Sequence, residues 1–120
     1  MKKYICLQVM CMCSILFAST QVHAYKYGLG SCLDQSLDQV IWSAIQEENL
    51  DGFIFLGDNV YGDQPNGQLF KMKNAYEIQK SRLPKWLMKE KEILAIWDDH
   101  DFGLNDGGRD YLYKEKAKKM

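Results

Sequence analysis

The sequence of 120 residues has only two prolines, Pro65 and Pro84, and it contains no internal repeat and no low-complexity tract. Nothing therefore marks a linker between domains, and the length suits one small globular domain. The formal net charge is -1, with acidic and basic residues interspersed. Because basic stripes hold nucleic-acid backbones, the sequence predicts no nucleic-acid partner, and the lysines from Lys114 to Lys119 are expected to form a solvated helix face.

A membrane-spanning segment is also missing, because the apolar run from Tyr4 to Phe17 falls short of the ~20 residues that a spanning helix needs. Two lysines precede this run, and Val22-His23-Ala24 follows it. This order is typical of a secretory signal peptide over residues 1–24. We therefore expect cleavage before Tyr25, a secreted or periplasmic protein, and no stable membrane anchor after cleavage. An uncleaved anchor is the alternative.

The chain that follows the signal peptide has too few cysteines for an internal disulfide. Three of the four cysteines lie within residues 1–24, and only Cys32 remains after them. A single cysteine in an exported protein is a buried apolar residue, a reactive thiol or a metal ligand. The residue pattern around Cys32 leaves these three alternatives open.

The sequence does contain an alternation of strand and helix patterns. Strands are predicted over residues 25–31, 53–56 and 93–97, and the last two are continuous apolar runs that are expected to be buried. Helices are predicted over residues 36–45, 69–81, 84–87 and 109–119, the first with Ser36 as its N-cap and Gln39 as its capping-box partner. Strands joined by helical crossovers form βαβ units, so we predict an α/β fold with a parallel sheet.

Polar side chains follow all three predicted strands. Ser31-Cys32 ends the first strand, Gly57-Asp58-Asn59 ends the second, and Asp98-Asp99-His100-Asp101 ends the third. The carboxyl ends of parallel strands lie at one edge of a sheet, where the ligands of open α/β sheets bind. The sequence therefore predicts a metal site assembled from these strand-end loops.

The stretch from Asp98 to Asp101 carries the strongest chemical signal, because four consecutive ionisable side chains need something to offset their repulsion. Carboxylate and imidazole groups are ligands for divalent and trivalent cations. The alternative is an acidic turn in which Asp99 or Asp101 caps the following segment. The glycine-containing loop after it is flexible enough to bring Asn105 or Asp106 back to the same place.

Asp58 lies at the tip of the second predicted strand, and Tyr61 follows three residues later. The Asp58 carboxylate is placed to bridge two cations. The alternative is a strand-terminating turn in which Tyr61 is packed. Asp63 is predicted to be a solvated acid of the same loop, and a metal ligand is the alternative.

Several other kinds of site are disfavoured by residue spacing or by charge. Beyond Asp99, the third oxygen ligand and the glycine of an EF-hand are out of register. The Gly28-Leu29-Gly30 run lacks the third glycine of a dinucleotide-binding fingerprint, and Ser31 does not lie in a nucleophile elbow. A flavodoxin-like binding module is disfavoured because acidic strand ends repel phosphate unless cations intervene.

Three ordered blocks of the sequence resemble the PhoD-like (alkaline phosphatase D) branch of the calcineurin-like metallophosphatases. The blocks are Gly30-Ser31-Cys32, the segment from Gly57 to Asp63, and the segment from Trp97 to Gly103 with Asn105-Asp106. Each block alone is weakly specific, but their order, spacing and strand-end placement are specific together. Cys32 in the first block and Asp99 in the third are departures from the wider superfamily that resemble the PhoD-like variant.

The resemblance implies that residues 25–120 are the N-terminal part of a PhoD-like domain, which is half of a four-layer αββα sandwich. The implied function is an exported phosphatase or phosphodiesterase that hydrolyses a phosphate ester through a metal-activated water. The implied cofactors are Fe³⁺ and Ca²⁺.

The resemblance also assigns roles by position. Cys32 and Tyr61 would bind iron, and Asp58 would bridge the metals. The second cation would be held by Asp99 with Asn105. The implied catalytic residues are His100, which would stabilise or protonate the leaving group, and Asp101, which would orient it.

The later histidine and aspartate ligands of that family come from downstream segments that this sequence does not include. We therefore expect a truncated domain that is catalytically incompetent on its own. The competing hypothesis is a non-catalytic, exported metal-binding remnant. A sheet of so few strands also has open edges and apolar faces, so the chain is predicted to be marginally stable and to associate.

Overall fold

A computed structural model describes residues 23–120, so nearly all of the predicted signal peptide lies outside the described residues. Three strands form one parallel sheet in the order β1-β2-β3, with β1 at Tyr27–Gly30, β2 at Gly52–Leu56 and β3 at Glu92–Ile96. The predicted α/β fold with a parallel sheet is therefore confirmed. Within residues 23–120, no helix combines the length and the apolar character that crossing a membrane requires.

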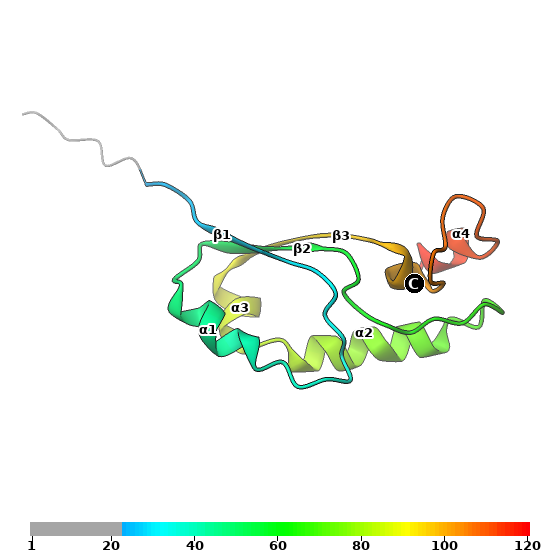
Figure 1. The fold of residues 1–120 in the computed structure, drawn as a ribbon, viewed down its shortest axis with the longest axis horizontal. Coiled ribbons are helices and arrows are strands. Elements are labelled where there is room, and N and C mark those ends of the chain that lie inside the picture. Colours follow the sequence, from blue (N-terminus) through cyan, green and yellow to red (C-terminus); the bar gives the residue numbers. More distant parts are fainter. Residues whose placement is uncertain (1–22) are drawn as a thin grey trace, which may run out of the picture.

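Helices cover one face of this sheet. The crossover from β1 to β2 contains α1 (Ile41–Glu47), and the crossover from β2 to β3 contains α2 (Phe70–Arg82) and α3 (Lys85–Glu90). All three helices lie on the same side of the strands (Figure 1). The 3-10 helix η1 (Asp99–Phe102) and the short helix α4 (Lys114–Ala117) follow β3 and lie beyond the carboxyl ends of the strands.

The first helix begins five residues later than predicted, so the assignment of Ser36 as its N-cap is wrong. The hydroxyl and the backbone N–H of Ser36 both donate to Oδ1 of Asp34, at 2.7 Å each, and form a local turn. Gln39 accepts a hydrogen bond from Nε1 of Trp42 instead of closing a capping box. Local side-chain hydrogen bonds of this kind compete with helix initiation, and α1 starts at Ile41 without a side-chain cap.

The core lies between the sheet and the helices. Phe53 and Phe55 of β2 project toward the helices, and their rings pack edge to face at 4.9 Å between centroids. Trp42 of α1 packs on Phe53 at 5.4 Å, and Leu50 and Leu87 complete the buried cluster. Large aromatic side chains of this kind contribute most to the burial energy of a small core.

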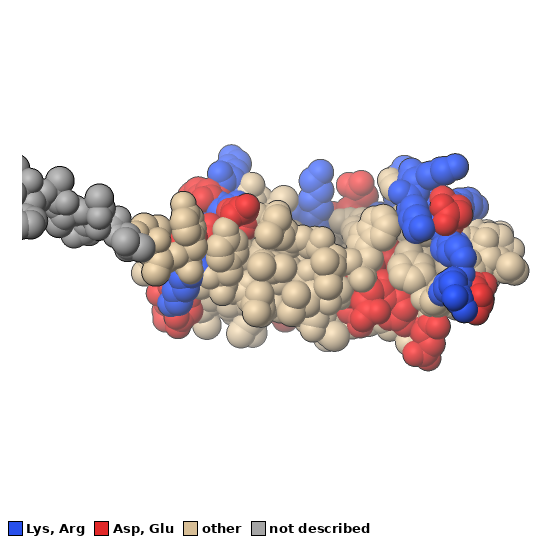
Figure 2. Space-filling view, turned by 90° about the horizontal axis from the view of Figure 1, so that it is seen from above, with Lys and Arg blue, Asp and Glu red and all other residues tan. Residues whose placement is uncertain are grey.

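The opposite face of the sheet is open. Four aliphatic side chains on it are 43% to 64% exposed, and they are Leu29, Leu56, Leu94 and Ile96. Figure 2 looks down on this face and shows a broad stretch without charged side chains. The predicted burial of the second strand on both faces and of the third strand is therefore wrong, because helices cover only one face of the sheet. The sequence pattern of β3 is that of a strand covered on both sides.

The predicted helix over residues 109–119 is also shorter than expected. Only Lys114–Ala117 is helical, and the residues before it form turns in which the N–H of Tyr111 donates to the carbonyl of Gly108. The Tyr111 side chain is 6% exposed and packs near Phe102 and Tyr113. The turns bury the Tyr111 ring, and the helix therefore starts at Lys114 instead of at Arg109.

Candidate metal centre

The loops after β1 and β2 are joined by backbone hydrogen bonds at the carboxyl edge of the sheet. The N–H of Cys32 donates to the carbonyl of Gly57 at 3.2 Å, and the N–H of Leu33 donates to the carbonyl of Asp58 at 2.9 Å. Cys32 and Asp58 have positive φ angles of 58° and 52°. Non-glycine residues rarely adopt this left-handed conformation, so both loops turn sharply where the strands end.

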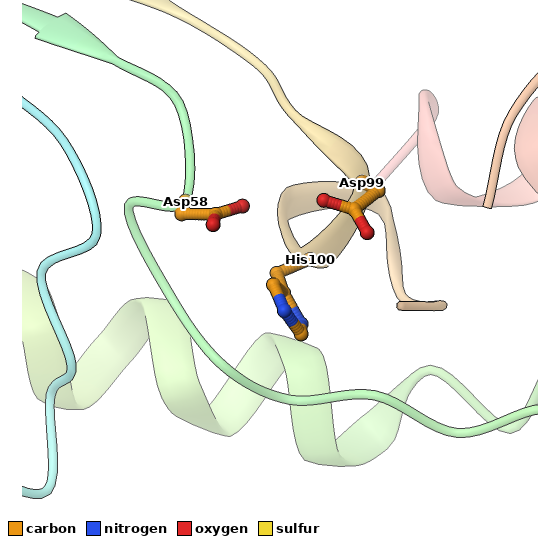
Figure 3. Close-up of side chains that lie close together, drawn as sticks. All are labelled: Asp58, Asp99 and His100. Carbon is orange, nitrogen blue, oxygen red and sulfur yellow. The ribbon is translucent and has the colours of Figure 1, made fainter. Parts of the chain in front are cut away.

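Three potential metal ligands converge at this edge. One ligand atom from each of Asp58, Asp99 and His100 lies within 4.8 Å of the other two. Asp58 comes from the loop after β2, and the other two residues come from η1. Figure 3 shows the three side chains grouped around a common space. The structure therefore brings together residues that are about forty positions apart in the sequence, as expected for the strand ends of a parallel sheet.

The Asp58 carboxylate is partly satisfied. Its Oδ2 lies 3.3 Å from the hydroxyl of Tyr61 and 3.6 Å from Sγ of Cys32. Its Oδ1 is buried, and no described residue provides a hydrogen bond to it. A buried carboxylate oxygen without a partner is costly, and a cation in the space between Asp58, Asp99 and His100 would remove that cost.

Tyr61 is fixed by a pair of hydrogen bonds with a buried glutamine. Its N–H donates to Oε1 of Gln35 and its carbonyl accepts from Nε2 of the same side chain, both at 2.8 Å. Burial raises the pKa of the Tyr61 phenol, and the neighbouring Cys32 thiol and Asp58 carboxylate add to this increase. The phenol ring lies 4.4 Å from the ring of His100, centroid to centroid. A phenolate at this position thus requires a cation beside it.

The partner of His100 is Asp63. Nδ1 of His100 lies 2.8 Å from Oδ2 of Asp63, and the two side chains are 18% and 26% exposed. Burial opposes protonation of His100, but the hydrogen bond and charge of Asp63, with the charges of Asp58 and Asp99, raise the pKa of His100 overall. Asp63 is therefore a paired side chain of the site, and its prediction as a solvated turn acid is wrong.

Asp101 has a structural role in place of the predicted orientation of His100. Its side chain is buried and accepts hydrogen bonds from the N–H of Asn59 at 2.8 Å and the N–H of Asp98 at 2.9 Å. Asp98 is the N-cap of η1, and its side chain accepts from the N–H of Asp99 at 2.9 Å. Asp98 and Asp101 also form a capping box, in which each side chain accepts from the backbone N–H of the other residue. Burial raises the pKa of Asp101, and the hydrogen bonds from Asp98 and Asn59 oppose this shift. The acidic stretch does contain a helix cap, as the alternative proposed, but the capping residue is Asp98, and Asp101 binds back to the backbone of Asp98 within the same helix. The cap coexists with the Asp58–Asp99–His100 cluster.

The loop after η1 returns to the cluster as predicted, but by a backbone contact. The N–H of Asp106 donates to Oδ2 of Asp99, while the side-chain amide of Asn105 donates to Asp106 at 2.8 Å. Asn105 is not part of the group of three potential ligands. Of the predicted ligands, Asp58 and Asp99 thus lie in the cluster, Cys32 and Tyr61 contact Asp58, and Asn105 lies in the loop that contacts Asp99.

Three contacts of this region were not predicted. Gln35 holds Tyr61, Asn59 binds Asp101, and Asp63 binds His100. Asp63 closes the block from Gly57 to Asp63, so its place in that block is the one sequence signal that pointed to it. Gln35 has no comparable signal, because its contact depends on how the loop after β1 folds.

Comparisons with known proteins do not identify a family. A scan against family models gives no match, and searches of curated proteins and of solved structures give none either.

Proposed function

We propose that this chain forms the metal-binding edge of a phosphoesterase of the PhoD-like kind, which hydrolyses phosphate monoesters or diesters. The observation that carries the proposal is the convergence of Asp58, Asp99 and His100 within 4.8 Å at the carboxyl edge of a parallel sheet. The order of lysines, apolar run and small residues before Tyr25 supports export. The ordered sequence blocks, which meet at this edge, support the family.

The side chains present fit the implied metals. Oδ1 of Asp58 is buried without a hydrogen-bond partner, and a bound cation would supply the missing interaction. Cys32 and Tyr61 offer sulfur and phenol oxygen next to Asp58, which suits Fe³⁺, and Asp99 offers carboxylate oxygen, which suits Ca²⁺. Asn105 remains a proposed further ligand of the second cation. Bound metals would polarise the phosphoryl group and lower the pKa of a bound water.

The chain's own contribution to the reaction would be proton transfer by His100. A proton on Nδ1 is held by the Asp63 carboxylate at 2.8 Å, which orients the ring and leaves Nε2 for the leaving oxygen. The raised pKa of His100 keeps the imidazole protonated closer to neutral pH, as a general acid requires. In this proposal Asp63 takes the orienting role, and Asp101 holds η1 in place.

The proposed four-layer αββα arrangement needs a second sheet on the open face. Support for it comes from the exposed aliphatic side chains of Leu29, Leu94 and Ile96, which lie opposite the helices. Contiguous apolar surface of this kind marks an interface. The three described strands and their helices would then form one sheet and one helical layer of the sandwich.

The competing function is metal binding without turnover. It is favoured by the small number of grouped ligands among the described residues, which is three, whereas a calcium ion alone binds about 6 to 8 oxygens. Both functions need the same cluster, so only a turnover measurement separates them.

The test combines metal binding with hydrolysis of p-nitrophenyl phosphate and bis-p-nitrophenyl phosphate in the presence of Fe³⁺ and Ca²⁺. Turnover that needs metal and is lost in Asp58→Asn and Asp99→Asn, but kept in the exposed control Asp38→Asn, supports the phosphoesterase. Metal binding without turnover is the result expected of this chain on its own, and it supports the competing function if it persists when the downstream segments of the domain are supplied. Absence of metal binding contradicts both.

A further inference from the structure

Asp51 links the starts of all three strands at the amino edge of the sheet, opposite the edge that carries the Asp58–Asp99–His100 cluster. Its N–H donates to the carbonyl of Lys26 at 2.8 Å, and its carbonyl accepts from the N–H of Glu92 at 3.2 Å. Its side chain binds the same strand, because Oδ2 accepts from the N–H of Lys26 at 2.7 Å. Asp51 thus fixes the place at which the chain enters β1.

The second carboxylate oxygen of Asp51 is held more weakly. Among the described residues its one hydrogen-bond partner is Nε2 of His23, at 3.2 Å from Oδ1. The side chain of His23 is 71% exposed, whereas that of Asp51 is 30% exposed. Exposed pairs of this kind contribute little to stability. The contact with His23 is therefore easily replaced by a better donor.

The ammonium group of Lys26 does not take this place. It donates to the carboxylate of Glu48 at 2.6 Å and to the carbonyl of the same residue at 2.8 Å. The N–H of Lys26 and the His23 side chain lower the pKa of Asp51, so its carboxylate is charged at neutral pH. A charged oxygen at the start of β1 is thus left for a further cation.

The predicted cleavage before Tyr25 removes His23 and creates a cation beside this oxygen. Residues 23–26 are exposed and belong to no helix or strand, so the bond between Ala24 and Tyr25 is accessible on the folded chain (Figure 1). Cleavage leaves an α-ammonium group on Tyr25, one residue before the N–H that binds Asp51. Consecutive Cα atoms are only about 3.8 Å apart, so rotation within Tyr25 brings this group to the carboxylate.

We propose that Asp51 binds the new α-ammonium group of Tyr25 in the processed chain, in place of His23. The inference rests on the proposed export, because it needs the cleavage before Tyr25. An α-ammonium group is charged at neutral pH, so the exchange gives Asp51 a charge-assisted hydrogen bond. The pair anchors β1, an edge strand of four residues that leads into Cys32.

The first experiment detects the contact itself. The full chain is expressed with export in a bacterial host and purified after processing, and its intact mass gives the first residue. A carbodiimide, which joins an amine to a carboxylate in direct contact, is applied without metal, and peptide mass spectrometry locates the links. We expect a link between the amine of Tyr25 and Asp51. The contact of Lys26 with Glu48 at 2.6 Å is the internal positive control.

The second experiment measures the pKa of the α-ammonium group by NMR titration. A carboxylate beside it favours its charged form, so this pKa should lie about 0.5 unit above the ordinary range of about 7.7 to 8.0. Asp51→Asn keeps an acceptor for the N–H of Lys26 but removes the charge, and should return the pKa to that range. Asp38→Asn is the control and should leave the pKa raised.

The other charged groups at this edge are unchanged in all three chains. They are Lys26 with Glu48, Lys91, which acts on Asp51, and Glu92, which binds the hydroxyl of Tyr27. A difference between Asp51→Asn and Asp38→Asn therefore reports the Asp51 carboxylate. Circular dichroism checks that each variant is folded.

Two outcomes would overturn this proposal alone. One is a chain that begins at Tyr25 and shows the Lys26–Glu48 link but no link between Tyr25 and Asp51. The other is an α-ammonium pKa that is the same in the parent and in Asp51→Asn. An intact mass that retains residues 1–24 would overturn the predicted cleavage together with the proposal. Because no metal or phosphate ester is present, none of these outcomes bears on the phosphoesterase proposal.

Discussion

Nδ1 of His100 lies 2.8 Å from Oδ2 of Asp63, although the two residues are 37 positions apart in the sequence. The loop after β2 carries Asp63 across the carboxyl edge of the sheet to reach η1. The neighbouring Asp101, which the family resemblance implied as the partner, instead binds the backbone of Asn59 and Asp98. The orientation of the imidazole is thus set by a loop rather than by the helix that carries it.

Asp63→Asn is predicted to lower the pKa of His100. The hydrogen bond and charge of Asp63 are the main factors that raise this pKa against the opposing effect of burial, so their loss lets burial dominate. The measurement is an NMR titration of the imidazole protons in metal-free protein. Asp38→Asn, an exposed aspartate elsewhere, should leave the His100 titration unchanged. A His100 titration that is the same in Asp63→Asn and in the parent would contradict the pairing.

The pairing of His100 with Asp63 also makes the free energy of unfolding depend on pH. A histidine whose pKa is higher in the folded than in the unfolded state stabilises the fold fully below the unfolded pKa of about 6.5, and this contribution is lost as pH rises through the folded pKa. The difference in unfolding free energy between the parent and Asp63→Asn should therefore be larger at pH 5 than at pH 9. A difference that grows with pH would have the wrong sign.

Asp101→Ala is predicted to destabilise the fold by about 1 to 3 kcal/mol, because the backbone N–H groups of Asn59 and Asp98 would lose the buried, charged acceptor that Asp101 provides. Asp110→Ala, whose side chain is 98% exposed, should change stability by less than about 0.5 kcal/mol. Chemical denaturation without added metal measures both values. Equal stabilities of the two variants would show that the capping box around η1 is dispensable.

Gly62→Ala is predicted to cost about 1 to 3 kcal/mol, because a Cβ at this position would meet the backbone of Lys71 and Met72 at the start of α2. The matched control is Gly108→Ala, since a Cβ at Gly108 meets no atom within 4 Å. Thermal unfolding of the two variants checks the difference. If Gly62→Ala unfolds at the temperature of Gly108→Ala, the close approach of the loop to α2 is not as described.

The open sheet face is predicted to drive association of the chain. Leu94 and Ile96 are 48% and 57% exposed on this face, and a lysine at either position would interrupt the apolar surface. Leu94→Lys and Ile96→Lys should therefore shift the chain toward monomer and reduce binding of a hydrophobic dye. Leu112→Lys is the control, because Leu112 is 87% exposed but lies outside the sheet. Analytical ultracentrifugation would contradict the prediction if all three variants behaved alike.

The fold class could be predicted because its signals are local and periodic. The apolar run of β2 between two glycines and the helical spacing before Arg82 both correspond to elements of the structure. The burial of β3 could not be predicted, since an apolar strand looks the same in sequence whether one or both of its faces are covered. The start of α1 was missed because Asp34 binds Ser36, and that contact depends on a turn rather than on helix propensity.

The candidate site was predictable to the extent that it follows from topology. Parallel strands align their carboxyl ends, so the meeting of Asp58 with Asp99 could be expected from the strand order alone. The side-chain pairings could not be predicted in the same way. Whether His100 binds Asp63 or Asp101 depends on the path of the loop after β2, and no periodic pattern encodes that path.

The central claim is that Asp58 and Asp99 hold a metal ion beside His100, and calorimetric titration with Mn²⁺ tests it most directly. Mn²⁺ accepts carboxylate ligands, so it is a suitable probe of these two side chains. We expect saturable binding to the parent chain and to Asp38→Asn, and at least about tenfold weaker binding, a loss of about 1.4 kcal/mol, in both Asp58→Asn and Asp99→Asn. Affinity in Asp58→Asn and Asp99→Asn equal to that of the parent, or no saturable binding to the parent, would contradict the account.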